Sequence, residues 1–164
     1  MAFDTYIKIA DIEGEATAKG FEKQIEIYSF SWGASNPTTV GPGSDGLSAG
    51  RASLSSFNIM KKTEKSSAKL FQSCVSGKAI DNAIVTMRKA GGDAGQEAFL
   101  TYTFTNVMVE SIQWSGSSGG DDTPTESVSL AFAKVEIEYK AQDDKGKVAV
   151  AGQASWDQTT VSSS

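Results

Sequence analysis

Alternating apolar and polar residues recur along most of the chain, and this period-2 pattern limits its fold more than any other feature. In the first run, the predicted buried face consists of Phe3, Thr5, Ile7 and Ile9. Such alternation is typical of a β-strand with one buried face. Further strands are predicted at 23–34, 51–60, 82–89, 97–114 and 126–140, followed by a weak final strand that contains Trp156.

Two of these strands change their apolar face partway along. In 23–34 the apolar residues change from Ile25 and Ile27 to Tyr28, Phe30 and Trp32. In 126–140 they change from Val128, Leu130 and Phe132 to Val135, Ile137 and Tyr139. Such a switch lets one strand serve two sheets or two partners. We expect 23–34 to be a central strand.

One helix is predicted, over residues 63–76. Thr63 can cap its start, and Gly77 supplies the usual C-terminal stop. Its predicted buried stripe consists of Ala68, Leu70, Phe71, Cys74 and Val75. The strands and this helix predict a mainly β fold, a compact antiparallel β-barrel or a sandwich, with one short α-helix.

Residues 36–50 contain no period-2 run and are rich in Gly, Pro and Ser, which predicts a long irregular connection. Gly41, Gly43 and Gly46 match the dinucleotide-binding fingerprint by spacing. That fingerprint works only between a strand and a helix, whereas here Pro42 interrupts it and a strand follows. A surface loop with a role in contacts is the better interpretation.

Composition excludes several classes of function. The 164 residues include no His and one Cys, so the chain has no His-based catalytic triad, no imidazole zinc ligand and no internal disulfide. The net charge of −5 argues against nucleic acid as a partner. Because Asp4 and Lys8 interrupt the first apolar stretch, we expect no signal peptide, synthesis and folding in the cytoplasm, and no membrane insertion.

The remaining candidate sites have ordinary structural explanations. Glu136 and Glu138 share a strand face at a spacing that suits a glycosidase pair, but alternating charge on a solvated face explains them equally well. The other candidates are a cation loop (Asp121, Asp122 and Glu126), a sugar platform (Trp32, Trp114 and Trp156) and a basic cluster (Lys61, Lys62, Lys65 and Lys69). We interpret these as solvated loop charge, core or interface aromatics, and a solvated helix flank. No catalytic, cofactor or metal residue is predicted.

An ordered set of segments resembles a known family. MAFDTYIKIADIEGEAT, EKQIEIYSFSWGASNP, KSSAKLFQSCVSGKAI, VTMRKAGG and SVSLAFAKVEIEYKAQ together resemble the haemolysin-coregulated protein (Hcp) family of type VI secretion systems. The resemblance spans about residues 1–157. It implies a single β-barrel domain with one helix over 1–157, and we expect 158–164 to be a frayed tail.

The resemblance also implies an assembly. Hcp-like subunits form hexameric rings that stack into the inner tube of a contractile injection machine, contact its spike and sheath, and carry effector proteins out of the cell. On this basis we predict that Ser29 and Ser31 face the lumen. We predict that the connection at 36–50 makes the ring-to-ring contact through Val40, Gly41, Gly43, Asp45 and Leu47.

Three alternatives stay open at this point. A carbohydrate-binding β module would use the Trp residues, a two-carboxylate enzyme would use Glu136 and Glu138, and a virus-like tail-tube protein would share the tube geometry.

Overall fold

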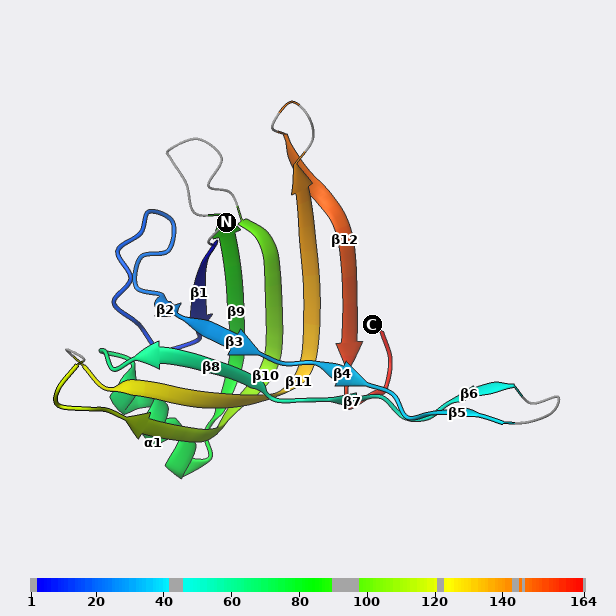
Figure 1. The fold of residues 1–164 in the computed structure, drawn as a ribbon, viewed down its shortest axis with the longest axis horizontal. Helices are drawn as coiled ribbons and strands as arrows, with labels where there is room; N and C mark the ends of the chain where they lie inside the picture. The colour runs from blue at the N-terminus through cyan, green and yellow to red at the C-terminus, as the bar shows by residue number, and fades with distance from the viewer. Residues whose placement is uncertain are drawn as a thin grey trace.

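One long antiparallel sheet, curled into a nearly closed barrel, dominates the computed structural model, which describes residues 3–41, 46–89, 98–120, 123–142, 145 and 147–163 (Figure 1). The strands follow the order β2-β1-β9-β10-β11-β8-β3, and β12 pairs with β11. Their bounds are β1 (Phe3–Ile9), β2 (Ile25–Ile27), β3 (Ser29–Ser31), β8 (Phe57–Lys62), β9 (Ala79–Lys89), β10 (Ala98–Ser115), β11 (Thr125–Gln142) and β12 (Val148–Asp157). The predicted mainly β barrel with one helix is confirmed.

The segment predicted as one central strand at 23–34 instead forms the two ends of the sheet. Its first part is β2 and its second part is β3, and the backbone N–H of Tyr28 between them donates to the carbonyl of Met60 on β8 (2.8 Å). The prediction of a central strand is therefore wrong. Ile25 and Ile27 point inward before the corner and Phe30 packs against the core after it, while Tyr28 at the corner is exposed.

Strands β10 and β11 bend at the same level. Each strand therefore contributes inward-facing residues to two parts of the barrel. On β10 the buried residues change phase between Phe104 and Val107, and on β11 between Phe132 and Val135. Asn106 takes a left-handed backbone conformation at the bend (φ 54°). Below the bend β11 pairs with β8, and above it with β12. The predicted face switch in 126–140 is confirmed.

Aromatic rings fill the barrel where the strands bend. The Phe104 ring lies 4.8 Å from that of Phe57 and 4.6 Å from that of Phe132, centroid to centroid. Trp32 meets Phe104 and Tyr102 edge to face. These tilted and edge-on contacts are the arrangements that aromatic rings prefer in a packed core.

Helix α1 (Ser67–Ser76) begins later than predicted. Ser66, not Thr63, precedes its first turn, and its side chain makes no capping hydrogen bond. The Ser67 hydroxyl instead accepts from the backbone N–H of Glu64 (2.9 Å). Its end is as predicted, with Gly77 in the left-handed conformation (φ 65°). The buried side chains of α1 are Ser67, Leu70 and Ser73.

Residues 34–41 and 46–54 form the two sides of a projecting β-hairpin where an irregular connection was predicted. Two short pairs build it, β4 (Ala34–Ser35) with β7 (Ser53–Leu54) and β5 (Thr38–Val40) with β6 (Leu47–Ala49). Figure 1 shows this segment, which we call the arm, extending away from the barrel at the end opposite α1. The β-branched residues Thr38, Thr39 and Val40 favour the extended backbone despite the neighbouring glycines.

After β12 the chain makes a turn that side chains hold in place. The backbone of Asp157 forms an isolated antiparallel β-bridge with that of Ser162. The Asp157 carboxylate accepts hydrogen bonds from the Thr159 hydroxyl and backbone N–H (2.6 and 2.8 Å). These bonds hold the pKa of Asp157 below its usual value. A frayed tail at 158–164 and a single domain over 1–157 stay predictions. Within the described residues, the one helix is too short to cross a bilayer.

Candidate functional site

The arm carries an apolar knob that its own chain leaves exposed. Val40 and Leu47 are direct cross-strand partners, so their side chains stand next to each other on one face of the hairpin. They are 75% and 76% exposed. Thr39 and Ser48 form the opposite, polar face. We call Val40 and Leu47 the arm knob. Two adjacent aliphatic side chains that are exposed to water are typical of a surface that binds another molecule.

The base of the arm is fixed by its own hydrogen bonds. The backbone N–H of Gly50 donates both to the carbonyl of Pro37 and to the side-chain oxygen of Asn36, each at 2.8 Å. The Gly33 N–H donates to the Ser55 hydroxyl (2.8 Å). Of the predicted stacking residues, Val40, Gly41 and Leu47 lie on this arm, and Gly43 and Asp45 lie outside the described residues.

Two rows of uncharged residues, most of them small and polar, run across the outer face of β3, β8, β11 and β10. The register aligns two rows across these strands, Ser31, Asn58, Ser129 and Ser111 in one, and Ser29, Met60, Ser127 and Gln113 in the next. The Ser129 hydroxyl donates to the Asn58 side-chain oxygen. Ser29 and Ser31 are exposed, as predicted for residues opposite a core-facing set. Met60 is the one apolar residue among these eight uncharged positions, and Glu110, which accepts from the Ser56 hydroxyl, lies at the edge of the rows.

A hollow of about 540 Å³ opens on the other side of β11, next to the base of the arm. Its walls come from the barrel and from the arm base, and include Trp32, Leu54, Tyr102, Ile137, Ala154 and Trp156. All residues that line it in the described part of the chain are uncharged, and Ser155 is the one with a polar side chain besides the Tyr and Trp rings. We call this hollow the apolar groove.

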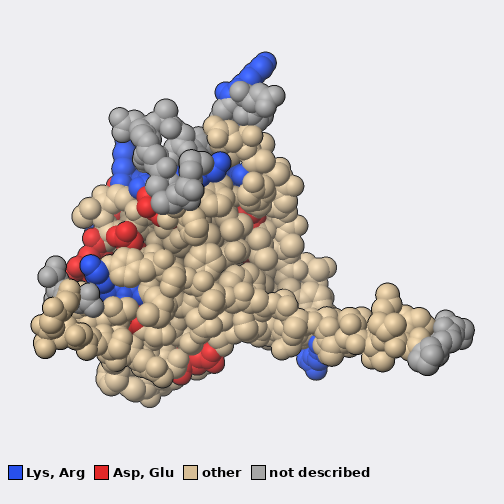
Figure 2. Space-filling model, in the orientation of Figure 1, with Lys and Arg blue, Asp and Glu red and all other residues tan. Residues whose placement is uncertain are grey.

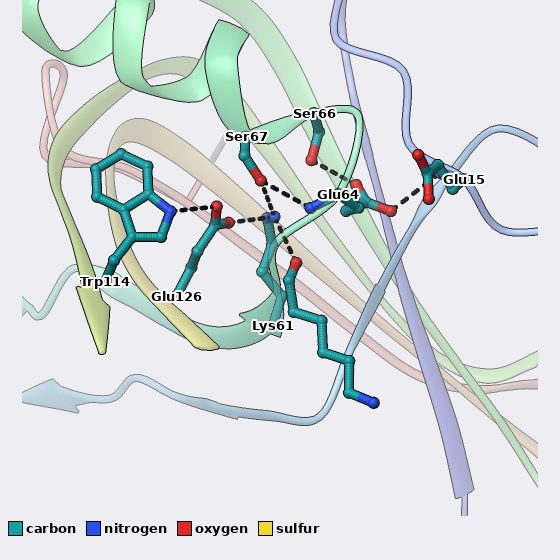
Figure 3. Close-up of polar contacts among 8 residues, drawn as sticks. Glu15, Lys61, Glu64, Ser66, Ser67, Trp114 and Glu126 are labelled. Carbon is teal, nitrogen blue, oxygen red and sulfur yellow. Dashed lines mark hydrogen bonds and ion pairs between the residues drawn. The ribbon is translucent and has the colours of Figure 1, made fainter. Parts of the chain in front are cut away.

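Beneath α1, a lysine and a glutamate are buried together (Figure 3). Lys61 on β8 and Glu126 on β11 are paired across the strands and both side chains are fully buried. The Lys61 ammonium contacts the Glu126 carboxylate, the Ser67 hydroxyl (3.3 Å) and the Lys62 carbonyl (3.1 Å). Glu126 also accepts from the indole N–H of Trp114 (2.6 Å). The ammonium therefore donates two hydrogen bonds and makes one ion pair, which together compensate its burial.

This pair corrects two predictions. Lys61 does not belong to a solvated helix flank, and Glu126 is not solvated loop charge. Both continue the inward phase of their strands, Lys61 after Phe57 and Ile59, and Glu126 before Val128. Their position in the alternating pattern could have indicated that Lys61 and Glu126 are buried. We assigned them to the surface because they are charged. Lys65, in contrast, is exposed and pairs with Glu13 (3.1 Å), and its hydrogen bond lowers the pKa of Glu13.

The other candidates come together only in part. Glu136 pairs with Lys134 (3.1 Å) and Glu138 with Lys140 (3.7 Å), along their own strand. Trp32 and Trp156 pack against the core and both line the apolar groove, whereas Trp114 lies against Phe71 on the rim near α1. Asp121 and Asp122 lie outside the described residues. Among the residues that are described, no three His, Cys, Asp or Glu side chains gather to hold a metal ion.

Comparison with known proteins identifies the family. The model of one family, described as type VI secretion system effector, Hcp, matches residues 6–139. The chain belongs to the Hcp family. Protein hcp1 of Pseudomonas aeruginosa is 38% identical over 146 residues, which make up 89% of this chain and 88% of that protein. The predicted resemblance to Hcp is thereby confirmed.

Solved structures agree with this assignment. A type six secretion system protein superposes with a TM-score of 0.92 at 36% identity, covering 99% of this chain and all of that one. Hcp1 from Salmonella typhimurium superposes with a TM-score of 0.77 at 30% identity, over the full length of both chains. The barrel, the helix and the arm are thus the Hcp fold, and the chain is a type VI secretion protein.

Proposed function

We propose that this Hcp chain is a structural subunit of the inner tube of a type VI secretion system. Six copies form a ring, rings stack into a tube, and the tube carries effector proteins in its lumen. The subunit is made in the cytoplasm and leaves the cell through the machine, where it meets spike and sheath proteins. This role needs neither a catalytic group nor a cofactor.

The observation that carries the proposal is the arm knob. Val40 and Leu47 are held far from the barrel on a hairpin, and burying such side chains stabilises a contact by roughly 1.5–3 kcal/mol each. The surface they need is on another molecule. A contact between unlike surfaces of identical copies closes into a ring or continues without end, and the second case gives a tube. We assign the arm, including Gly41, Gly43 and Asp45, to the ring-to-ring contact.

The uncharged rows on β3, β8, β11 and β10 support the lumen assignment for Ser29 and Ser31. A lining of Ser, Asn and Gln stays hydrated and offers no strong charge to an arriving protein. Cargo can then be held by many weak hydrogen bonds and released again. A charged lining of either sign would bind proteins of opposite charge tightly and repel the others.

The test is the size and shape of the purified protein. Light scattering after size exclusion should give the mass of six copies, and negative-stain microscopy should show a ring with a central hole. Gold bound to Ser31→Cys, in a Cys74→Ser background, should mark that hole. Removing residues 41–46 should leave the rings and abolish tubes. A monomer at tens of micromolar would contradict the ring, and tubes from the shortened chain would contradict the role of the arm.

A further inference from the structure

We infer that the apolar groove is the receptor for the arm knob of another copy of this chain. The inference rests on the proposed function, because it names the surface that the arm contacts when rings stack. Two features of the structure carry it. One is a projecting pair of aliphatic side chains, and the other is an open apolar hollow on the same molecule.

The chemistry of the two surfaces matches. The strands of the arm, Thr38–Val40 and Leu47–Ala49, contain no charged residue. The described residues that line the groove contain none either. Figure 2 shows a basic patch on the arm near the barrel, and the described outer part of the arm is free of both colours. Arg51, between β6 and β7, is exposed. An uncharged knob can enter an uncharged groove without leaving a buried ion unpaired.

The groove is incomplete in a single copy. Its aromatic and aliphatic walls, Trp32, Tyr102, Ile137 and Trp156, pack against the core on one side and are only half-buried on the other. A hollow of about 540 Å³ is large enough for both Val40 and Leu47. Filling it would remove apolar surface from water on both partners.

A chain cannot fill its own groove. Ala34 and Leu54 are cross-strand partners at the arm base, and they line the groove as part of its wall. From there the hairpin runs outward, away from the barrel (Figure 1). The knob of one copy therefore lies outside the groove of that copy, and the occupant has to be the knob of a neighbour. The repeated contact is head-to-tail.

Disulfide trapping tests the pairing. In a Cys74→Ser background, Leu47→Cys is combined with Ala154→Cys, and assembled tubes are oxidised mildly. A second pair, Val40→Cys with Leu54→Cys, covers the other side of the groove. We expect a ladder of linked copies on a non-reducing gel. Mixing chains that carry one cysteine each should stop the ladder at the dimer, which shows that the link joins two molecules.

The control is Ser48→Cys with Ala154→Cys, whose arm cysteine lies on the opposite face of the hairpin. A disulfide needs its two Cβ atoms within about 4.5 Å, so this pair should link far less.

In parallel, Val40→Asp with Leu47→Asp should raise the protein concentration needed for tube formation by roughly tenfold or more. Thr39→Asp with Ser48→Asp adds the same charge on the other face and should change it little.

The outcomes separate this inference from the proposed function. If tubes form but neither cysteine pair links, or if the control pair links equally well, the groove holds something else, such as cargo or a small apolar molecule, and the inference is overturned. If the knob enters its own groove, single chains link internally and the inference is likewise overturned. If the parent protein forms no rings or tubes at all, the proposed function itself fails.

Discussion

Lys61 and Glu126 show how one pair of residues can join a helix to a sheet. A charge buried alone would be costly, but here each partner satisfies the other, and Ser67 and Trp114 complete the set. Since Ser67 begins α1 and Trp114 ends β10, the pair fixes the position of the helix on the rim of the barrel. Buried polar groups that are fully satisfied favour one arrangement over others.

Removing one member of this pair should be costly. Lys61→Met leaves the Glu126 carboxylate buried without its cation, and we expect the free energy of unfolding to fall by about 3–5 kcal/mol. Chemical denaturation of the purified protein measures this. In the double variant Lys61→Met with Glu126→Leu, most of the loss should be recovered, because no buried charge is left.

Lys65→Met is the matched control, since that lysine pairs with Glu13 in solvent. It should change the free energy of unfolding by no more than about 0.5 kcal/mol. Equal effects of the two lysine substitutions would show that the buried pair has no special role.

At the scale of elements, strand periodicity predicted more than helix periodicity did. The alternation of apolar and polar residues correctly predicted strands β1, β9, β10 and β11. It also predicted the face switch between Phe132 and Val135, because each part of a barrel strand has one face that points inward. It did not show that 23–34 divides into two short strands, one at each end of the sheet order. Closure depends on contacts between distant strands, such as that of Tyr28 with Met60.

The apolar stripe predicted on α1 is only partly correct, since Leu70 is buried and Cys74 packs against the core. Phe71 and Val75 are 45% and 61% exposed, while Ser67 and Ser73 are buried. The predicted stripe assumed an apolar seat for the helix, whereas the seat includes the Lys61 ammonium, which needs the Ser67 hydroxyl. The apolar groove could not be predicted either, because its walls come from β4, β7, β10, β11, β12 and the residues that follow β3.

The arm base offers a test of whether the hairpin is a separate element. A methyl group on Gly50 would lie 2.7 Å from the carbonyl oxygen of Pro37, and backbone atoms cannot make room cheaply. Gly50→Ala should therefore open the base of the arm. We expect faster hydrogen exchange at the amides of 38–40 and 47–49, with tubes lost. The free energy of unfolding of the barrel should change by less than about 1 kcal/mol.

Gly33→Ala is the control at the same base, where a methyl group would meet nothing within 4 Å. It should leave hydrogen exchange at the arm amides unchanged. Gly33 also lines the apolar groove, so exchange and not tube formation is the readout for this control. If Gly50→Ala instead unfolds the whole chain, the arm and the barrel form one cooperative unit and the hairpin is not an independent element.

At the scale of the whole molecule, the surfaces proposed for assembly are those with least charge. The arm knob, the apolar groove and the serine-rich rows are uncharged apart from their borders. The whole chain carries a net charge of −5, and on the face shown in Figure 2 most charged side chains lie over the barrel. Copies in a tube therefore repel one another weakly through their net charge and attract one another through apolar contacts.

This division of charge predicts how tubes respond to salt. Sodium chloride screens the repulsion between negatively charged rings and does not weaken an apolar contact, so tubes should form at lower protein concentration as salt rises. Sodium sulfate at equal ionic strength should promote them further, because sulfate strengthens apolar burial while its screening is the same. Sedimentation of tubes across a salt series measures the effect. If sodium chloride dissolves the tubes, ion pairs hold the rings together, and the contact between knob and groove is not what drives stacking.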